Sequence, residues 1–501
     1  MIPVLLALGC SESVGHTGTD TAPAPDTAPE FDTTYDVVVV GSGPAGSAAV
    51  LAAAEAGASV VLFERETTLG EGVRMASQAY GILTPWQEDA GIVDSLALAQ
   101  AEWTTLTGAD GTAASVTAYL SGTSEVLVWL SDHGVDIRGP NNAAGEGSVA
   151  RIHEFRWPGE GTSFEQLMGD TAYTARTGVE VTGPVIVDGA VVGVEWRDVA
   201  TGETGATGAR GGVVVATGGF LRNREAVAEV RPDLAELDPI FETLKSSTGG
   251  GLPFFEAIGA GREEPANIGT YVHSVPDPRD PDTEAMILMT TPAYLLVGSD
   301  GQRFTAGGSF GSFDVVDLLP AGGAWLVAGV DDAESMVFSP PAYNWANQDA
   351  GPELYSLPAL QALGSEDLVV DADLATAAVV AGVDPAVADV IDAYNDLAAT
   401  SQTDEFGTSL DPTDQLRGTS WAFVHFRPAL AKNFGGVLTD LSSRVLTPDG
   451  TPIPGVWAAG ECVGMVPGGG SGRGFSGSAS ALYYGGRLAG AGAAERSLSA
   501  P

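Results

Sequence analysis

The stretch Tyr35–Arg65 constrains the fold of this chain more than any other, and it reads YDVVVVGSGPAGSAAVLAAAEAGASVVLFER. A continuous β-branched run that ends at Val40 is typical of a strand buried on both faces of a parallel sheet. Alanine-rich residues 45–56 predict a helix, and Val60–Phe63 predicts the next strand. The pattern therefore indicates a β–α–β unit in an α/β fold.

Three glycines between the first strand and the helix form the pattern G-x-G-x-x-G. Gly41 permits a tight turn, Gly43 lets the backbone approach a pyrophosphate, and Gly46 lets helix and strand pack closely. The helix N-terminus offers N–H groups and a positive dipole to phosphates. Glu64 follows roughly 20 residues later, where a carboxylate can accept bonds from ribose hydroxyls. The combination predicts nucleotide binding, and the alternative is a glycine-rich turn with a purely structural role.

Length, charge and cysteine content exclude several classes of protein. A chain of 501 residues suggests two or more domains, and 44% hydrophobic residues can bury a sizeable core. A formal charge of −43 repels phosphate backbones, so no nucleic-acid partner is expected. The two cysteines, Cys10 and Cys462, allow neither a disulfide framework nor a cysteine-ligated iron–sulfur cluster. Redox chemistry would therefore need a bound organic cofactor, and Cys462 is expected to be a small buried residue.

The N-terminal residues 1–10, MIPVLLALGC, resemble a bacterial lipoprotein signal with Cys10 as the lipidated residue. Their apolar run is too short to span a bilayer. Residues 11–33 are polar and proline-rich and predict a disordered tether. The resemblance implies an exported protein with a lipid anchor to the membrane, facing the periplasm or the cell exterior. Because the run lacks a basic n-region, a frayed terminus on a cytoplasmic protein remains the alternative.

Two further stretches place polar groups after a buried strand. GGVVVATGGF, residues 211–220, ends a strand at Thr217 and Gly218, and IPGVWAAGE, residues 453–461, ends a strand at Glu461. Ligands of open α/β sheets bind at the carboxyl ends of the strands. We therefore expect Glu461 at that edge, the alternative being that it only caps the helix further on.

These stretches, with TLGEGVRMASQAYGI, SSTGGG, VGSDGQRF and GGVLTD in the same order, resemble the fumarate reductase / succinate dehydrogenase flavoprotein family. That family includes the 3-ketosteroid dehydrogenases, and the resemblance covers residues from about 35 to 495. It implies a glutathione-reductase-like Rossmann FAD-binding domain, split in sequence into residues 34–268 and 415–496. An inserted α+β capping domain, residues 269–414, would close over the isoalloxazine of a non-covalently bound FAD.

The resemblance also implies which residues contact FAD. Glu461 would lie beside the ribityl chain, and a helix that starts near Ser476–Ala479 would stabilise the anionic reduced flavin with its N-terminus. The full set of implied cofactor contacts is Gly41, Gly43, Pro44, Ala45, Gly46, Glu64, Arg65, Gly70, Ala76, Ser77, Val185, Ala216, Thr217, Gly218, Gly460, Glu461, Ser476, Ser478, Ala479 and Leu482.

The catalytic residues of the family are matched only in part. His273 and Arg473 stand where the family clamps substrate carboxylates, and Lys432 stands where a second clamp histidine is expected. Gly311 occupies the position of the proton-donating arginine. Arg303, in the DGQRF segment, is expected to hold the cap by ion pairing.

The sequence as a whole predicts an FAD-dependent oxidoreductase that transfers a hydride between flavin N5 and a small organic substrate. The reaction would dehydrogenate a C–C bond, or reduce a C=C bond, next to a carbonyl or carboxylate. Because the chain has no haem or iron–sulfur motif, a separate redox protein or quinone would donate or accept the electrons. Two alternatives remain: a flavin-binding protein with a degenerate pocket that acts in electron transfer, and an NAD-dependent dehydrogenase.

Overall fold

The computed structural model describes residues 30–142, 147–263, 267–280, 285–306, 313–340, 354–465 and 477–499. The chain divides into Met1–Glu30 and Phe31–Pro501, and every helix and strand below belongs to the second unit. The predicted signal with Cys10 and residues 11–29 of the predicted tether lie outside the described residues. Of the helices in the described part of the chain, none combines the length and the apolar character that a membrane span requires.

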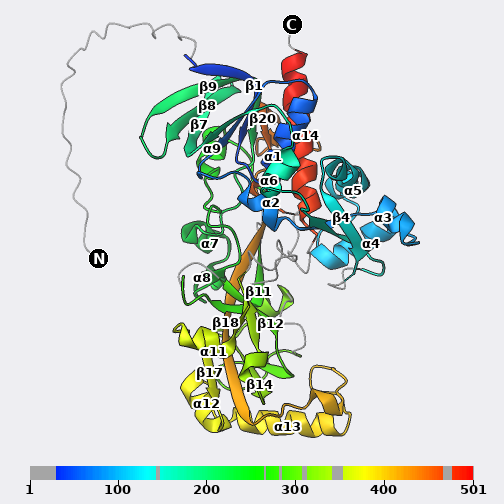
Figure 1. The fold of residues 1–501 in the computed structure, drawn as a ribbon, viewed down its shortest axis with the longest axis vertical. Helices are drawn as coiled ribbons and strands as arrows, with labels where there is room; N and C mark the ends of the chain where they lie inside the picture. The colour runs from blue at the N-terminus through cyan, green and yellow to red at the C-terminus, as the bar shows by residue number, and fades with distance from the viewer. Residues whose placement is uncertain are drawn as a thin grey trace, which may run out of the picture. The chain divides into compact units, whose positions relative to one another are not determined.

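The first sheet (Figure 1) has five parallel strands at its centre, and the two strands that the opening motif predicted are among them. In order they are β20 (Pro452–Ala458), β9 (Thr204–Val215), β1 (Thr33–Val40), β2 (Val60–Glu64) and β6 (Thr174–Thr177). Three strands add to it in antiparallel pairs: β19 (Arg444–Leu446), β7 (Val179–Val187) and β8 (Ala190–Asp198). Strand β20 lies beside β9 although some 240 residues separate them, so the sheet is assembled from both ends of the chain.

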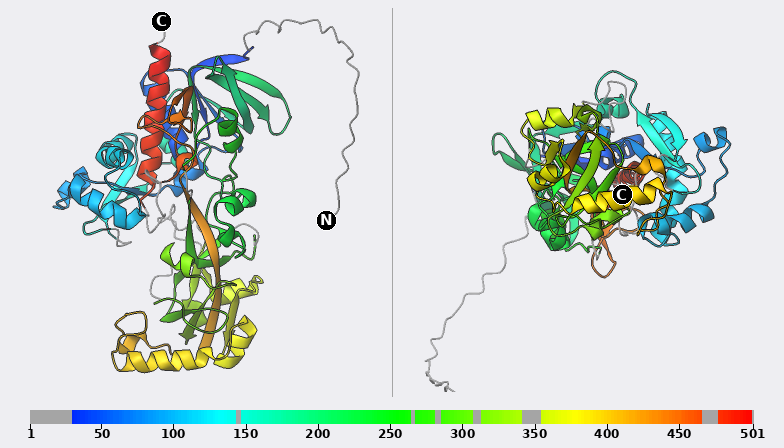
Figure 2. Two further views of the ribbon diagram at one scale, coloured as in Figure 1. Left: turned by 180° about the vertical axis from the view of Figure 1, so that it is seen from behind. Right: turned by 90° about the horizontal axis from the view of Figure 1, so that it is seen from below.

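Helix α1 (Pro44–Glu55) packs against the C-terminal helix α14 (Ala479–Leu498), and the two lie side by side in both Figure 1 and Figure 2. At two positions the backbone of α14 lies directly against the backbone of α1. A Cβ atom at Gly486 would lie 2.1 Å from the carbonyl oxygen of Ala45, and one at Gly490 would lie 2.1 Å from that of Ala49. Small residues on both helices therefore allow an approach that larger side chains would prevent.

A small sheet of β3 (Gln78–Tyr80), β5 (Ile152–Arg156) and β4 (Asp136–Asn141) holds the start of α14 in place. The hydroxyl of Ser480 donates to the carbonyl of Tyr80 at 2.8 Å, and the hydroxyls of Ser480 and Tyr119 are 2.7 Å apart. Both tyrosines are fully buried. They therefore position the N-terminal turn of α14.

The second sheet follows the order β13-β14-β18-β11-β12-β15-β16, with β10 and β17 also paired to β18. Strand β18 (Ser420–Phe434) is 15 residues long, and in Figure 1 it runs from the far end of this sheet back towards the first. The sheet also contains β10 (Ile240–Phe241), so it takes in strands on both sides of the predicted cap, residues 269–414. Its other strands are β11 (Asn267–Pro276), β12 (Ala285–Thr290), β13 (Tyr294–Val297), β14 (Ala324–Val330), β15 (Val337–Ser339), β16 (Tyr355–Ser356) and β17 (Leu368–Asp371).

A buried ion pair holds the outer part of this sheet's unit together. The Arg303 guanidinium lies 2.7 Å from the Asp404 carboxylate, with 4% and 1% of the two side chains exposed. The guanidinium also lies over the rings of Tyr394 and Phe406. The ion-pairing role predicted for Arg303 is confirmed.

The other helices of the described residues range from four residues in α8 to 19 in α5. They are α2 (Glu71–Met75), α3 (Pro85–Asp89), α4 (Leu96–Thr107), α5 (Ala114–Asp132), α6 (Ser163–Met168), α7 (Arg224–Val230), α8 (Pro232–Ala235), α9 (Leu252–Ala257), α11 (Leu357–Ala362), α12 (Leu374–Ala381) and α13 (Val387–Ala399), with 3₁₀ helices η1 (Phe313–Leu318), η2 (Ala333–Ser335), η3 (Pro412–Asp414) and η4 (Glu461–Val463).

Two glycines of α14 give a matched test of the close helix contact. Gly490→Ala should destabilise the protein by about 1–3 kcal/mol, because the new methyl group meets the carbonyl of Ala49. Gly485→Ala should be neutral or stabilising by up to about 1 kcal/mol, since its nearest contact would be an ordinary 3.5 Å and alanine favours helix. Thermal unfolding at a fixed FAD concentration measures both, and equal effects would contradict the backbone contact.

Candidate functional site

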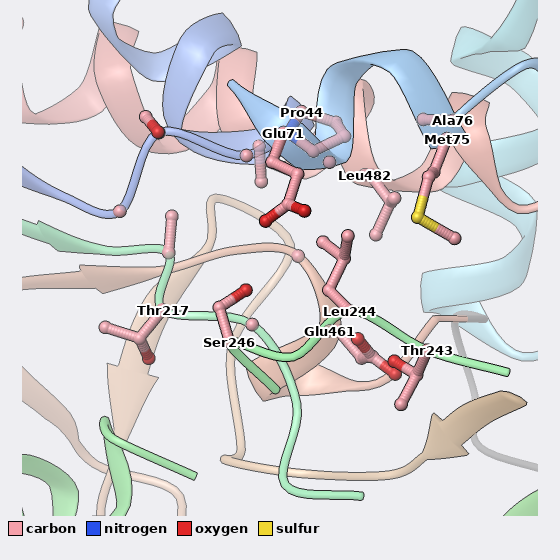
Figure 3. A pocket seen from close by; sticks show the side chains of 18 of the residues that line it. Pro44, Glu71, Met75, Ala76, Thr217, Thr243, Leu244, Ser246, Glu461 and Leu482 are labelled. Atoms are coloured by element: carbon pink, nitrogen blue, oxygen red, sulfur yellow. The ribbon is translucent and has the colours of Figure 1, made fainter. Parts of the chain in front are cut away.

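A cavity of about 300 Å³ opens where the carboxyl ends of the parallel strands meet (Figure 3). The turn after β1, the end of β2, the turn after β9 and the turn after β20 all contribute to its wall. Helices α2 and α14 line it as well, through side chains that include Met75 and Leu482. The edge of the first sheet therefore forms the site, as the rule for open α/β sheets predicts.

Each of the three glycines after β1 occupies a position that favours glycine for a different structural reason. Gly41 has φ +97°, and a Cβ atom there would lie 2.4 Å from the carbonyl oxygen of Ala216. A Cβ atom at Gly46 would lie 1.8 Å from the carbonyl oxygen of Gly41. At Gly43 it would meet no described atom within 4 Å, because this residue faces the cavity. The space beside Gly43 is therefore open for a ligand to approach the backbone.

The same turn presents a helix N-terminus to the cavity. Helix α1 has 12 residues, begins with Pro44, and has Gly43 as its N-cap residue. Glycine has no side chain to bond the N–H groups of the first turn, so these donors are left for an anion. The geometry fits a pyrophosphate.

One end of the cavity carries the carboxylate of Glu64. It accepts hydrogen bonds from the backbone N–H of Ser42 at 2.9 Å and from the hydroxyl of Ser42 at 2.6 Å. Its other oxygen accepts from the backbone N–H of Glu66 at 3.0 Å. Arg65 lines the cavity beside it and donates to the hydroxyl of Thr248 at 3.0 Å. These contacts hold the carboxylate where the sequence predicted a partner for ribose hydroxyls.

The other carboxylate predicted to contact the cofactor, Glu461, lies at the end of β20 on the cavity wall. It accepts from the backbone N–H of Asn433 at 3.1 Å, and the Asn433 amide donates to the Glu461 carbonyl at 2.7 Å. Burial raises the pKa of Glu461 to about 7, while the Asn433 hydrogen bond and the charge of Lys432 oppose the rise. The Thr217 hydroxyl nearby is buried and has no partner among the described residues, which fits a site that a ligand completes.

Cys462 follows this carboxylate in the chain. Its thiol donates to the carbonyls of Ala459 at 3.2 Å and Val215 at 3.4 Å. Burial raises the pKa of the thiol to about 12, so it stays protonated at neutral pH. Cys462 is half-buried rather than fully buried, and the apolar, structural role expected of it stays a prediction.

The second sheet forms another wall of the cavity. Of its residues named here, the sequence predicted only Lys432. Glu242 follows β10, Tyr271 lies on β11, and Lys432 lies near the end of β18. His273, two residues beyond Tyr271, is not on the cavity wall. Its Nε2 atom lies 3.0 Å from a carboxylate oxygen of Glu242, and its ring stacks on that of Tyr271 with centroids 4.8 Å apart.

Most of the predicted cofactor residues meet at this cavity. Gly46 and Gly70 lie behind the lining, where Gly70 donates its N–H to the Ser42 hydroxyl at 2.9 Å. Val185 lies further along β7, and Val179 and Val181 line the cavity instead. Arg473, Ser476 and Gly311 lie outside the described residues. The predicted residues on the wall are Gly41, Gly43, Pro44, Ala45, Glu64, Arg65, Ala76, Ser77, Ala216, Thr217, Gly218, Lys432, Gly460, Glu461, Ser478, Ala479 and Leu482.

Comparison with known families decides what this cavity holds. The model of the FAD binding domain family matches residues 36–476, which is most of the chain. The chain belongs to this FAD-binding family. FAD is therefore its cofactor, and the turn after β1 with the start of α1, here called the cofactor cradle, fits it. The open face of Gly43 and the N-terminus of α1 would hold the pyrophosphate, Glu64 would hold the ribose, and the Thr217 hydroxyl nearby has no partner within the described part of the chain.

Relatives of this FAD-binding chain are oxidoreductases. It is 27% identical to the NADH:fumarate oxidoreductase of Klebsiella pneumoniae (strain 342) over 89% of its own length and 46% of that protein. It thus spans about half of the Klebsiella relative. It is 26% identical to the vinyl phenol reductase of Lactiplantibacillus plantarum (strain ATCC BAA-793 / NCIMB 8826 / WCFS1), over 92% of this chain and 96% of that protein.

A solved structure shows the same architecture. The 3-ketosteroid-Δ4-(5α)-dehydrogenase of Rhodococcus jostii RHA1 superposes with a TM-score of 0.68 and 25% identity, over 94% of this chain and 99% of that one. The fold is the glutathione-reductase-like FAD-binding domain with a capping domain, as the sequence predicted, and the chain is a member of an FAD-dependent oxidoreductase family.

Two substitutions separate the roles of the cradle glycines. Gly43→Val should leave the stability of the FAD-free protein near that of the wild type, because its side chain enters open space. It should weaken FAD binding about 100-fold or more, since it occupies the approach to the helix N-terminus. Gly46→Ala should instead destabilise the FAD-free protein by about 1–3 kcal/mol. Fluorescence titration with FAD and thermal unfolding measure these effects; wild-type FAD affinity in Gly43→Val would refute the assignment.

The raised pKa of Glu461 predicts a pH dependence of stability in the FAD-free protein. Between about pH 4.5 and about pH 7 the native state keeps a proton on Glu461 that the unfolded chain has lost. The native state therefore binds more protons, and the free energy of unfolding falls as the pH rises through this range. Glu461→Gln should remove this component, so its stability relative to wild type should rise by at most about 3 kcal/mol from pH 5 to pH 8. Urea unfolding at several pH values measures it, and a pH-independent difference would contradict the shift.

Proposed function

We propose that this protein is an FAD-dependent oxidoreductase that transfers a hydride at a carbon–carbon bond of a small organic substrate. The bond would be activated by a neighbouring electron-withdrawing group, and the reaction would reduce a C=C bond or dehydrogenate a C–C bond. Bound FAD supplies the hydride-carrying chemistry. The chain's own residues bind and orient the substrate, exclude water and set the charge around the reacting atoms.

The observation that carries this proposal is that one cavity is walled by both sheets. The edge of the first sheet supplies the cofactor cradle, and the second sheet adds Glu242, Tyr271 and Lys432 to the same cavity. A purely structural cofactor site would need no second wall with polar side chains. A binding site that combines an apolar surface with a few convergent polar groups is the usual form of a small-molecule site.

Apolar side chains cover much of the cavity around these polar groups. Met75, Leu244 and Leu482 point into it (Figure 3). They reduce the access of water and lower the local dielectric, which strengthens the effect of each charge on the wall. A cavity from which water is excluded also limits side reactions of reactive groups bound in it.

The N-terminus of α14 contributes a partial positive charge. Helix α14 has 20 residues, and Ser478, Ala479 and Leu482 of its first turn line the cavity. A helix N-terminus stabilises negative charge that lies in front of it. Together with the Lys432 ammonium, it would favour the anionic form of a reduced group in that part of the cavity.

The electron partner belongs to the proposal as well. The Klebsiella relative is named for NADH, and it is longer than this chain. We propose that a separate redox protein or a quinone exchanges electrons with the FAD of this protein. The reaction direction depends on which partner and which substrate are present.

The proposed reaction predicts that the flavin exchanges electrons with an activated alkene. Holoprotein reduced with dithionite under anaerobic conditions should reoxidise with at least one member of a panel of alkenes that contains fumarate, 4-vinylphenol and an enone steroid, and the flavin absorbance should return. The FAD-binding-deficient Gly43→Val protein is the matched control. If FAD stays bound and none of these compounds, nor their saturated counterparts with oxidised protein, changes the flavin spectrum, the electron-transfer alternative replaces this one.

A further inference from the structure

One carboxylate on the substrate side of the cavity is not explained by FAD binding. Glu242 is 6% exposed and follows directly after β10. Its backbone N–H donates to the carbonyl of Leu430 on β18 at 2.9 Å, so its position is fixed by the pairing of β10 with β18. It lines the cavity on the wall formed by the second sheet. A buried acidic residue at such a place needs partners, because burying a charge without them is costly.

His273 gives Glu242 one partner from behind the wall. Its Nε2 atom lies 3.0 Å from one carboxylate oxygen, and His273 itself is 8% exposed. Its ring stacks on Tyr271 at an interplanar angle of 11°, which fixes the ring's orientation. A carboxylate has two oxygens and about four lone-pair directions. Because the His273 ring nitrogen occupies only one of these directions, Glu242 can accept further hydrogen bonds from a molecule in the cavity.

The charge of Glu242 itself disfavours a substrate carboxylate placed against it. Of the described basic residues on the cavity wall, Lys432 is close enough to Glu461 to lower its pKa, and Arg65 bonds to Thr248 and Glu66 beside the cradle. A carboxylate placed against Glu242 would meet a like charge in a partly apolar cavity. A hydroxyl or N–H group would instead donate a charge-assisted hydrogen bond.

We propose that Glu242, held by His273, is the anchor for a hydrogen-bond donor on the substrate. The substrate class is then an activated alkene, or its saturated product, that carries a hydroxyl or N–H group and is neutral or cationic at that end. Dicarboxylates such as fumarate are disfavoured. This inference rests on the proposed function, because it assigns a specificity to the same cavity.

A matched pair of probes tests the assignment by binding alone. 4-Vinylphenol and 4-vinylbenzoate share one skeleton and differ in carrying a hydroxyl or a carboxylate. Titrated into oxidised holoprotein and followed by the perturbation of the flavin spectrum, the phenol should bind about tenfold tighter or more. Glu242→Gln removes the charge but keeps a hydrogen-bonding group of similar size. It should reduce this preference about tenfold, mainly by improving the binding of the benzoate.

Glu180→Gln is the control for a general change of charge. Glu180 also lines the cavity, but it lies on β7 of the first sheet and pairs with Arg197. Its substitution should leave the ratio of the two dissociation constants unchanged. FAD content and thermal unfolding show that each variant is folded and loaded.

Three results would overturn the assignment: a benzoate that binds as tightly as the phenol, a phenol that fails to perturb the flavin at its solubility limit, or a ratio that Glu242→Gln leaves unchanged. If the bound flavin exchanges electrons with alkenes but Glu242→Gln leaves the ratio of the two dissociation constants unchanged, only the role proposed for Glu242 is refuted. A flavin that exchanges electrons with no alkene would refute the proposed function.

Discussion

The fold depends on a backbone contact between two turns that lie far apart in the chain. The carbonyl of Ala216, after β9, occupies the space that a side chain at Gly41 would need, and the carbonyl of Gly41 in turn occupies the space at Gly46. Such contacts leave no room for even one methyl group. They bring the ends of β1 and β9 to one point, and β20 joins them by pairing with β9. The cofactor cradle is the outer surface of this contact.

The same principle governs the C-terminal helix. Gly486 and Gly490 let α14 touch the backbone of α1, and this contact sets how far the helix extends towards the cavity. Ser480 then fixes the rotation of its first turn through Tyr80 of the small sheet and Tyr119 of α5. The end that faces the cofactor is thus positioned by two sets of contacts that lie outside the cavity. A helix dipole is useful only when its direction is fixed, and here the supporting contacts supply that direction.

The parts of the site that follow from local geometry could be predicted from the sequence. Gly41, Gly43 and Glu64 lie within one β–α–β unit, so the spacing alone determines where they meet. Glu461 could be placed because a buried strand leads straight into it. Val185 illustrates the limit. It lies about 13 Å beyond Val181 at the usual rise per residue, and a bulge between Val181 and Gly183 changes the alternation of faces. No local pattern reveals a bulge.

The wall that the second sheet adds to the cavity could not be predicted for a different reason. Glu242 follows a strand of two residues, and its place depends on the pairing of that strand with β18 almost 190 residues later. Strand β18 joins the two parts of the site. Its outer half pairs with strands of the second sheet, and its inner end carries Lys432 to the cavity and Asn433 to the Glu461 carboxylate.

Asn433 holds the carboxylate of Glu461 by its backbone N–H, and Lys432 acts on the same carboxylate through its charge. Two consecutive residues of β18 therefore act on the Glu461 carboxylate, and one of them, Lys432, also forms part of the second-sheet wall. A ligand that displaced Lys432 would change the charge that Lys432 exerts on Glu461, so the second-sheet wall and this carboxylate are linked through the end of β18.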